Sequence, residues 1–186
     1  MGEPGARLSP AAAVLVVVDY QEKMMTAIHD RAGVLARVER LVRGVELLGL
    51  PVLVTEQYPR GLGRTEPQLI AALGEHYRPI EKTTLSIMGE PAFRNALQAT
   101  GRLQVILCGV EAHVCVCQSA IDLRRWGFEV HVAADCISSR RGEDAAVALR
   151  RMEQHGCWMS THEMAVFELL AESGTPAFKE WIRMIR

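Results

Sequence analysis

The sequence lacks the features that mark several classes of protein. It has 186 residues with 21 Lys and Arg against 22 Asp and Glu, a formal net charge of −1, and its basic residues are spread along the chain. This distribution offers no electrostatic footprint for nucleic acid or for a membrane surface. No segment reaches the roughly 20 consecutive apolar residues that a membrane-spanning helix needs. We therefore expect neither a nucleic acid nor a membrane as partner.

The cysteine pattern also excludes some kinds of site. There are five, an odd number, with no CxxC pair and no Cys/His spacing of the zinc type. The apolar run at 11–18 has no basic segment before it and no small-residue cleavage site after it, so it does not fit a secretory signal. We expect a reduced, cytoplasmic protein that uses no cofactor.

Apolar runs and helical patterns alternate along the chain. The stretch "AAAVLVVVD" at 11–19 is continuously apolar and β-branched, which is typical of a strand covered on both faces. The alternation predicts a single α/β domain over 1–186, a three-layer α/β/α fold with a mostly parallel, Rossmann-like sheet and a loose N-terminal extension at 1–10. The predicted strands are 11–19, 50–56, 77–83, 103–109, 128–136 and 157–160, and the predicted helices are 34–48, 66–75, 90–100, 115–126, 142–156, 161–173 and 176–185.

In such a fold the ligand binds beyond the carboxyl ends of the strands, which narrows the search. Asp19 follows the first strand, Glu56 the second, Lys82 ends the third, and Cys115 follows the loop after the fourth. Taken singly, Asp19 could cap a strand, Lys82 could lie on the surface, and Cys115 could be a core residue. Together, an acid, an ammonium and a thiol suit nucleophilic acyl chemistry, in which Asp19 takes the thiol proton.

Two cysteines lie at the junction of the fourth strand with the next helix. Cys115 is predicted to begin that helix, where the backbone dipole and a nearby cation favour the thiolate. Cys117 lies about 200° further round and is expected to face the sheet or a neighbouring helix. A redox pair formed by the two is a weaker alternative, because side chains two apart on a helix diverge.

Four segments in order resemble one known family. They are "DYQ" at 19–21, "KTTLS" at 82–86, "CGVEAHVCV" at 108–116 and "AADCISSR" at 133–140. The set is similar to the isochorismatase-like cysteine hydrolases, which include nicotinamidases and carbamoyl-amine amidases, and it covers nearly the whole chain. "TEQYPRGLGRT" at 55–65 is most similar to the isochorismatase-domain-containing branch.

The resemblance implies a catalytic triad and a reaction. Asp19, Lys82 and Cys115 would form the triad of a hydrolase that acts on a small amide-like substrate through a covalent thioester. A cis peptide at Val110–Glu111 would direct the amides of Glu111 and Cys115 as an oxyanion hole.

Departures from the family pattern limit what the resemblance implies. Nicotinamidases carry Asp-x-His-Pro after the second strand as metal ligands, whereas this chain reads "EQYP" at 56–59. We therefore expect no metal, and nicotinamide does not fit as substrate. Ala112 and His113 replace a frequent Thr-Asp before the nucleophile. These changes keep open an alternative, a catalytically silent member that acts as a binding or scaffold protein.

The remaining candidates are weaker. Gln21 and Tyr58 are expected to line the pocket or to pack loops, and His113 to contact the substrate or to face solvent. The family resemblance implies oligomerisation, and an apolar C-terminal segment that includes Trp181 also favours a homo-oligomer. Three cysteines are expected in the core and five histidines at the surface or at helix caps: Cys108, Cys136 and Cys157, and His29, His76, His131, His155 and His162.

Overall fold

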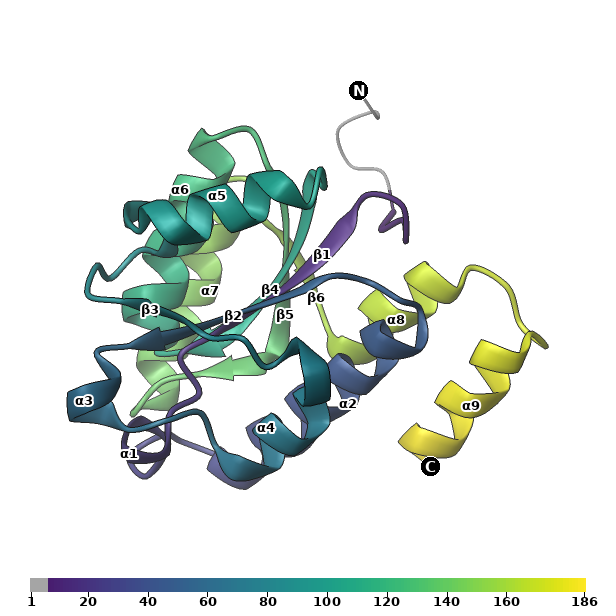
Figure 1. Cartoon of the computed structure of the whole chain (residues 1–186), viewed down its shortest axis with the longest axis horizontal. Helices are drawn as coiled ribbons and strands as arrows, with labels where there is room; N and C mark the ends of the chain where they lie inside the picture. Colours follow the sequence, from purple (N-terminus) through teal and green to yellow (C-terminus); the bar gives the residue numbers. More distant parts are fainter. Residues whose placement is uncertain (1–6) are drawn as a thin grey trace.

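The computed structural model describes residues 7–186 as a six-stranded sheet between two layers of helices (Figure 1). All five pairs of neighbouring strands are parallel, and their order across the sheet is β3-β2-β1-β4-β5-β6. The predicted α/β fold is confirmed. The strands are β1 (Ala13–Val18), β2 (Val52–Gln57), β3 (Ile80–Lys82), β4 (Gln104–Val110), β5 (Glu129–Ser138) and β6 (Trp158–Ser160).

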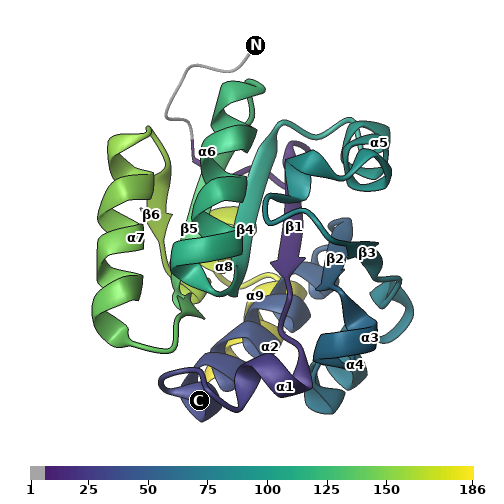
Figure 2. The ribbon, with the colours of Figure 1, turned by 90° about the vertical axis from the view of Figure 1, so that its left-hand side faces the viewer.

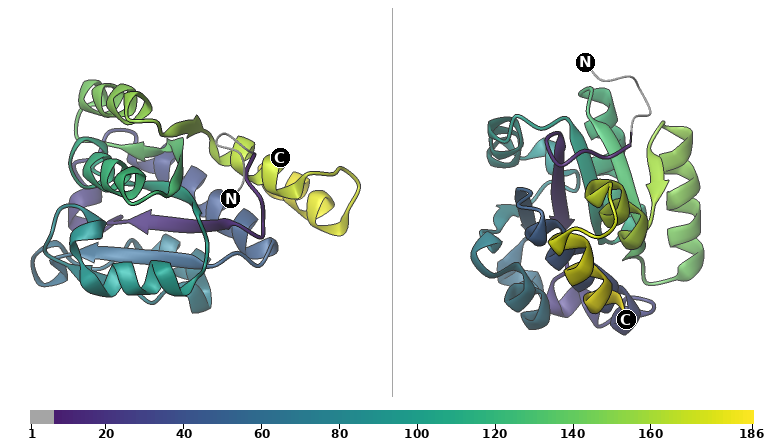
Figure 3. Two further views of the ribbon diagram at one scale, coloured as in Figure 1. Left: turned by 90° about the horizontal axis from the view of Figure 1, so that it is seen from above. Right: turned by 90° about the vertical axis from the view of Figure 1, so that its right-hand side faces the viewer.

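Helices cover both faces of this sheet. In Figure 2, α6 and α7 lie in front of the strands and α2 and α8 lie behind them; α8 and the outermost helix α9 face the viewer in the right panel of Figure 3. The helices are α1 (Glu22–Met25), α2 (Arg31–Leu47), α3 (Pro59–Leu62), α4 (Pro67–Leu73), α5 (Pro91–Ala99), α6 (Cys117–Arg125), α7 (Gly142–Gln154), α8 (His162–Leu170) and α9 (Pro176–Ile185).

The two central strands explain why the sheet is covered on both faces. Every residue of β1 and of β4 is buried, as expected of strands that are apolar throughout except for Gln104 at the start of β4. The chain runs outward from β1 to β2 and β3, then returns to β4 on the other side of β1. The carboxyl ends of β1 and β4 therefore flank the point where the strand order reverses, the usual position of a ligand site in such sheets.

Some predicted boundaries shift, and one shift affects the candidate nucleophile. The helix predicted to begin at Cys115 begins earlier, with a π-helical turn over Ala112–Val116 (η3) that continues into α6. Cys115 therefore lies inside a helical segment and not at its first residue.

The two ends of the described chain are attached to the domain. Residues 1–6 of the predicted loose extension lie outside the described residues. In the remainder, the Leu8 amide donates to Glu168 Oε2 at 3.0 Å and the Ser9 amide donates to Gln104 Oε1 at 2.9 Å. At the other end, Trp181 of α9 is fully buried within its own chain. Within residues 7–186, no helix combines the length and the apolar character that crossing a membrane requires.

Candidate active site

The three predicted catalytic side chains meet at the carboxyl end of the sheet. Lys82 Nζ lies 2.7 Å from Asp19 Oδ2, and both side chains have 0% exposure. Cys115 is 3% exposed, and its thiol is close enough to both partners for each to influence its ionisation. Residues 19, 82 and 115 are far apart in the sequence, so only the fold brings them together.

Asp19 is held so that one of its carboxylate oxygens keeps an acceptor position free. The residue lies directly after β1 with a left-handed φ of 56°, a conformation that Asp tolerates better than most residues. Its Oδ1 accepts a hydrogen bond from Thr55 Oγ1 at 2.7 Å. Its Oδ2 makes the ion pair with Lys82, but the alignment is not that of a hydrogen bond, and no other donor in residues 7–186 reaches this atom. A further donor can therefore approach Oδ2.

Lys82 is surrounded by oxygen atoms. Besides Asp19, its ammonium donates to Gln57 Oε1 at 2.6 Å and to the carbonyls of Thr84 and Leu85 at 3.3 and 3.4 Å. An ammonium has three N–H donors, and a buried charge is tolerated only where such donors are satisfied. These contacts satisfy the donors of Lys82, so it can remain charged in the interior.

The pKa of the Cys115 thiol is raised to about 12, first by burial and then by the negative charge of Asp19, while Lys82 acts in the opposite direction. The resting thiol is therefore protonated at neutral pH. This differs from the thiolate that its expected place at a helix start favours, because the cysteine lies within the π-turn and Asp19 neutralises the lysine. For Cys115 to act as a nucleophile, its proton must first pass to a base.

The segment that carries the nucleophile is fitted closely against β1. A Cβ atom at Gly109 would lie 2.5 Å from Val18 Cβ and 2.7 Å from the Val18 carbonyl oxygen, so only glycine allows this approach. The next peptide, Val110–Glu111, is cis. On the other side, Ser119 Oγ donates to the Cys115 carbonyl at 2.5 Å and accepts from the Ile87 amide at 3.0 Å. The hydroxyl thus links the segment after Lys82 to the nucleophile.

The predicted substrate-binding residues have different surroundings. His113 is partly exposed, with Nδ1 2.8 Å from Ser139 Oγ, and Glu111 beside it is paired with Arg140. Gln21 is fully buried, and its side-chain amide is used within the protein. Its Nε2 donates to the carbonyls of Gln57 and Gly63 at 3.0 and 2.6 Å, and its Oε1 accepts from the Gln57 amide at 2.8 Å. Of the two roles expected for Gln21, these bonds favour loop packing.

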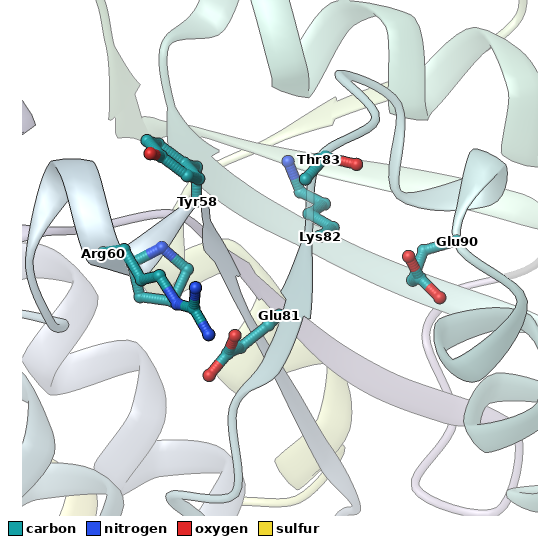
Figure 4. Close-up of a pocket in the computed structure, with 7 residues that line it drawn as sticks. Tyr58, Arg60, Glu81, Lys82, Thr83 and Glu90 are labelled. Atoms are coloured by element: carbon teal, nitrogen blue, oxygen red, sulfur yellow. The ribbon is translucent and has the colours of Figure 1, made fainter.

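A cavity of about 360 Å³ opens beside Lys82 (Figure 4). Tyr58 forms part of its wall, 54% exposed and with a left-handed φ of 39°. The cavity therefore borders the triad through the lysine. Its lining residues are Tyr58, Pro59, Arg60, Glu81, Lys82, Thr83 and Glu90.

Several residues at the site were not identified by sequence reasoning or were assigned a different role. Glu56, a candidate because it follows an apolar run, accepts hydrogen bonds from Thr65 N, Thr65 Oγ1 and Tyr77 Oη, so it braces loops. Gln57, the last residue of β2, contacts Lys82. Its only signal in the sequence was its position at a strand end.

A second polar cluster lies elsewhere in the fold. His162 Nδ1 is 2.5 Å from Asp135 Oδ2, and the side chains of Asp135, Cys136 and His162 offer ligand-type atoms within 4.8 Å of one another. His131 and His162, which were expected at the surface or at helix caps, are instead buried: His131 lies within β5, and His162 is the first residue of α8, after the N-cap Thr161. A 27-residue separation gives no local pattern that could have shown the Asp135–His162 contact.

Comparison with known proteins identifies the family of this chain. The family model described as "Isochorismatase domain" matches residues 13–164. The chain belongs to this family. Isochorismatase domain-containing protein 2 of Pongo abelii is 39% identical over 97% of this chain and 86% of the relative.

Solved structures show the same fold. A Caenorhabditis elegans structure described as MAR1 ribonuclease superposes with a TM-score of 0.91 at 39% identity, covering 97% of this chain and 92% of that one. The YcaC gene product of Escherichia coli, described as an octameric hydrolase of unknown specificity, gives a TM-score of 0.87 at 24% identity, covering 99% and 89%. The isochorismatase-family hydrolase fold is thereby established for this chain.

Proposed function

We propose that this protein is a cysteine-dependent hydrolase that cleaves a small amide-like or related substrate through a covalent thioester, without a metal. The observation that carries the proposal is the buried meeting of Asp19, Lys82 and Cys115 beside the switch point of the sheet. The metal-free assignment is supported by Tyr58, which stands where the family resemblance calls for a histidine ligand.

The proposed first half-reaction begins with the neutral thiol. Asp19 Oδ2 accepts the proton of Cys115, and the sulfur attacks the carbonyl carbon of the amide. The amides of Glu111 and Cys115 are the proposed donors to the oxyanion. The carbon–nitrogen bond then breaks as the proton passes from Asp19 to the departing nitrogen, which leaves as ammonia or an amine, and a thioester remains on Cys115.

The proposed second half-reaction restores the enzyme. Asp19 takes a proton from water, whose oxygen attacks the thioester carbonyl, and the carbon–sulfur bond breaks. The proton returns to sulfur as the carboxylic acid leaves. Lys82 stays an ammonium throughout and balances whichever partner is negative at each stage.

Two alternatives have specific support. The relative from Caenorhabditis elegans is described as a ribonuclease. In this chain, however, the formal net charge is −1 and the site's lysine is already paired with Asp19, which offers little to a phosphate backbone. The other alternative, a silent binding protein, is supported by the altered Ala112 and His113 before the nucleophile.

The test is a screen of small carboxamides and N-carbamoyl amines for release of ammonia, with a structured RNA as a separate substrate. Cys115→Ala should lower turnover by about 1,000-fold or more, because the nucleophile is lost. Cys117→Ala, which removes the neighbouring cysteine, should stay within a few-fold of wild type. Wild-type turnover by Cys115→Ala would overturn the mechanism. RNA cleavage, or ligand binding without any turnover, would favour one of the alternatives.

Self-association is proposed as well. The Escherichia coli neighbour is described as octameric, which supports a homo-oligomer here. Light scattering on the purified protein should give a mass several times the 20.6 kDa of one chain. A monomer at micromolar concentration would contradict this.

A further inference from the structure

We propose that Gln57 is a positioning residue of the site: its neutral amide fixes Lys82 as an ammonium while the countercharge of the lysine passes from Asp19 to Cys115. This inference rests on the proposed triad and adds to it a residue at the end of β2. It concerns how the site handles charge and does not depend on which amide is the substrate.

Gln57 contacts Lys82 more closely than any other oxygen around that lysine. The two residues are register partners at the ends of β2 and β3. Gln57 Oε1 accepts from Lys82 Nζ at 2.6 Å, and Gln57 Nε2 donates to the Thr83 carbonyl at 2.9 Å. Both halves of the amide are therefore engaged, and its orientation is fixed.

The backbone of Gln57 is held from the opposite side. Buried Gln21 accepts from the Gln57 amide at 2.8 Å and donates to the Gln57 carbonyl at 3.0 Å. The next residue, Tyr58, donates its amide to the Lys82 carbonyl at 2.9 Å. These bonds hold Gln57 rigidly, so it contacts Lys82 without any rearrangement during the reaction.

The charge of residue 57 is what matters chemically. Before proton transfer the negative charge lies on Asp19, and after transfer it lies on the sulfur of Cys115. Lys82 must attract both in turn. A neutral amide satisfies one N–H of the lysine without offering a second negative charge, so the new thiolate has no competitor for the cation. A carboxylate at position 57 would supply that competitor and would disfavour the thiolate.

The experiment is the rate of iodoacetamide labelling at Cys115, followed by peptide mass between pH 7 and 10. Because only the thiolate reacts, a plot of the logarithm of the labelling rate against pH is a rising line. A change in the pKa of the thiol displaces this line along the pH axis. Gln57→Glu keeps the shape of the side chain and should displace the line by about one unit to higher pH, or about tenfold slower labelling at a given pH.

Two further variants separate the effect of charge at position 57 from the effect of losing the hydrogen bond to Lys82. Gln68→Glu, at an exposed position of α4, adds the same charge away from the site and should leave the line within about twofold of wild type. Gln57→Met fills the same space without accepting a hydrogen bond and should displace the line less than Gln57→Glu. A purely structural role predicts the opposite sign, since loosening the site exposes the thiol and speeds labelling.

The outcomes are distinguishable from those of the proposed hydrolase activity. Labelling reports on the thiol whether or not any amide is cleaved, so a failed substrate screen leaves this result standing. An unshifted line in Gln57→Glu, or equal displacement in the glutamate and methionine variants, would overturn the inference about Gln57 and leave the triad untouched. Circular dichroism on each variant confirms that the labelled protein is folded.

Discussion

Two places in this protein each bring together an aspartate, a basic side chain and a cysteine. At the carboxyl ends of β1 and β3, Asp19 and Lys82 are 2.7 Å apart with Cys115 beside them. At β5 and the start of α8, Asp135 and His162 are 2.5 Å apart, again with a cysteine adjacent. Composition alone would rank the two clusters equally.

The difference lies in which hydrogen-bonding positions are already used. Both carboxylate oxygens of Asp135 are engaged by one residue: Oδ1 accepts from the His162 amide at 2.9 Å, and Oδ2 lies 2.5 Å from His162 Nδ1. Although burial acts to raise the pKa of Asp135, these bonds from His162 lower it overall. Asp19, by contrast, keeps a free acceptor at Oδ2. We therefore expect the contacts of Asp135 to contribute mainly to stability, and Asp19 to be the carboxylate that a further donor can approach.

The largest expected effect comes from neutralising each acid in turn. Asp19→Asn should lower turnover on an amide substrate by about 100- to 10,000-fold, because the base for the Cys115 thiol is lost. Asp135→Asn should leave turnover per folded molecule within a few-fold. The measurement is kcat/KM on the substrate found by the ammonia screen, normalised to the folded fraction. Equal losses in the two variants would remove the distinction between the clusters.

The sequence predicted that Asp19, Lys82 and Cys115 lie together, and it missed the Asp135 cluster for a physical reason. Apolar runs mark buried strands, and a parallel sheet gathers the residues that follow them, so Asp19, Lys82 and Cys115 could be grouped by their positions in the chain alone. Strand-end logic says nothing about side chains that meet across a helix start, as His162 does. It also cannot show a raised thiol pKa, which depends on how completely the surrounding segments exclude water.

Hydrogen bonds between distant segments could not be predicted from the sequence either. The amide of Gln57 contacts Lys82 across 25 positions, and the hydroxyl of Ser119 contacts the Ile87 amide across 32. No sequence pattern around this serine or this glutamine predicts a hydrogen-bond partner so far along the chain. The π-turn that places Cys115 inside a helical segment likewise depends on how the loop after β4 is packed.

A second, intermediate effect concerns acid stability. Because the pKa of Asp135 is lowered in the folded state, its ionised form contributes stability at pH values above its unfolded pKa. That contribution is lost as the pH falls through the folded pKa. Asp135→Asn should therefore cost about 2 kcal/mol of unfolding free energy near pH 6, the scale of a broken, partly buried charged hydrogen bond.

The gap between wild type and this variant should narrow as the pH falls below about 4. Urea unfolding followed by circular dichroism at several pH values measures it. A gap that stays constant down to pH 3 would mean that the asparagine acts through packing and not through loss of the charge. Asp122→Asn, which removes a partly exposed acid on α6, provides the matched control and should change little.

The smallest expected effect tests the link between the two halves of the active cluster. Ser119 is fully buried, and its hydroxyl joins the Ile87 amide, in the segment after Lys82, to the Cys115 carbonyl. Ser119→Ala leaves that amide buried without its partner, which should cost about 1–2 kcal/mol of unfolding free energy. Because lysine and thiol are then less firmly held relative to each other, turnover should fall by about two- to fivefold.

Ser160→Ala is the control for this change, since within residues 7–186 the one hydrogen bond of the Ser160 hydroxyl goes to the neighbouring Thr161 carbonyl at 3.3 Å, at the end of β6. It should leave turnover at the wild-type level. If Ser119→Ala loses stability but keeps full turnover, the lysine segment is positioned by Gln57 and the backbone alone. If turnover falls while stability does not, the serine acts on the geometry of the nucleophile more than on the packing of α6, and the active cluster depends on contacts from both sides of the sheet.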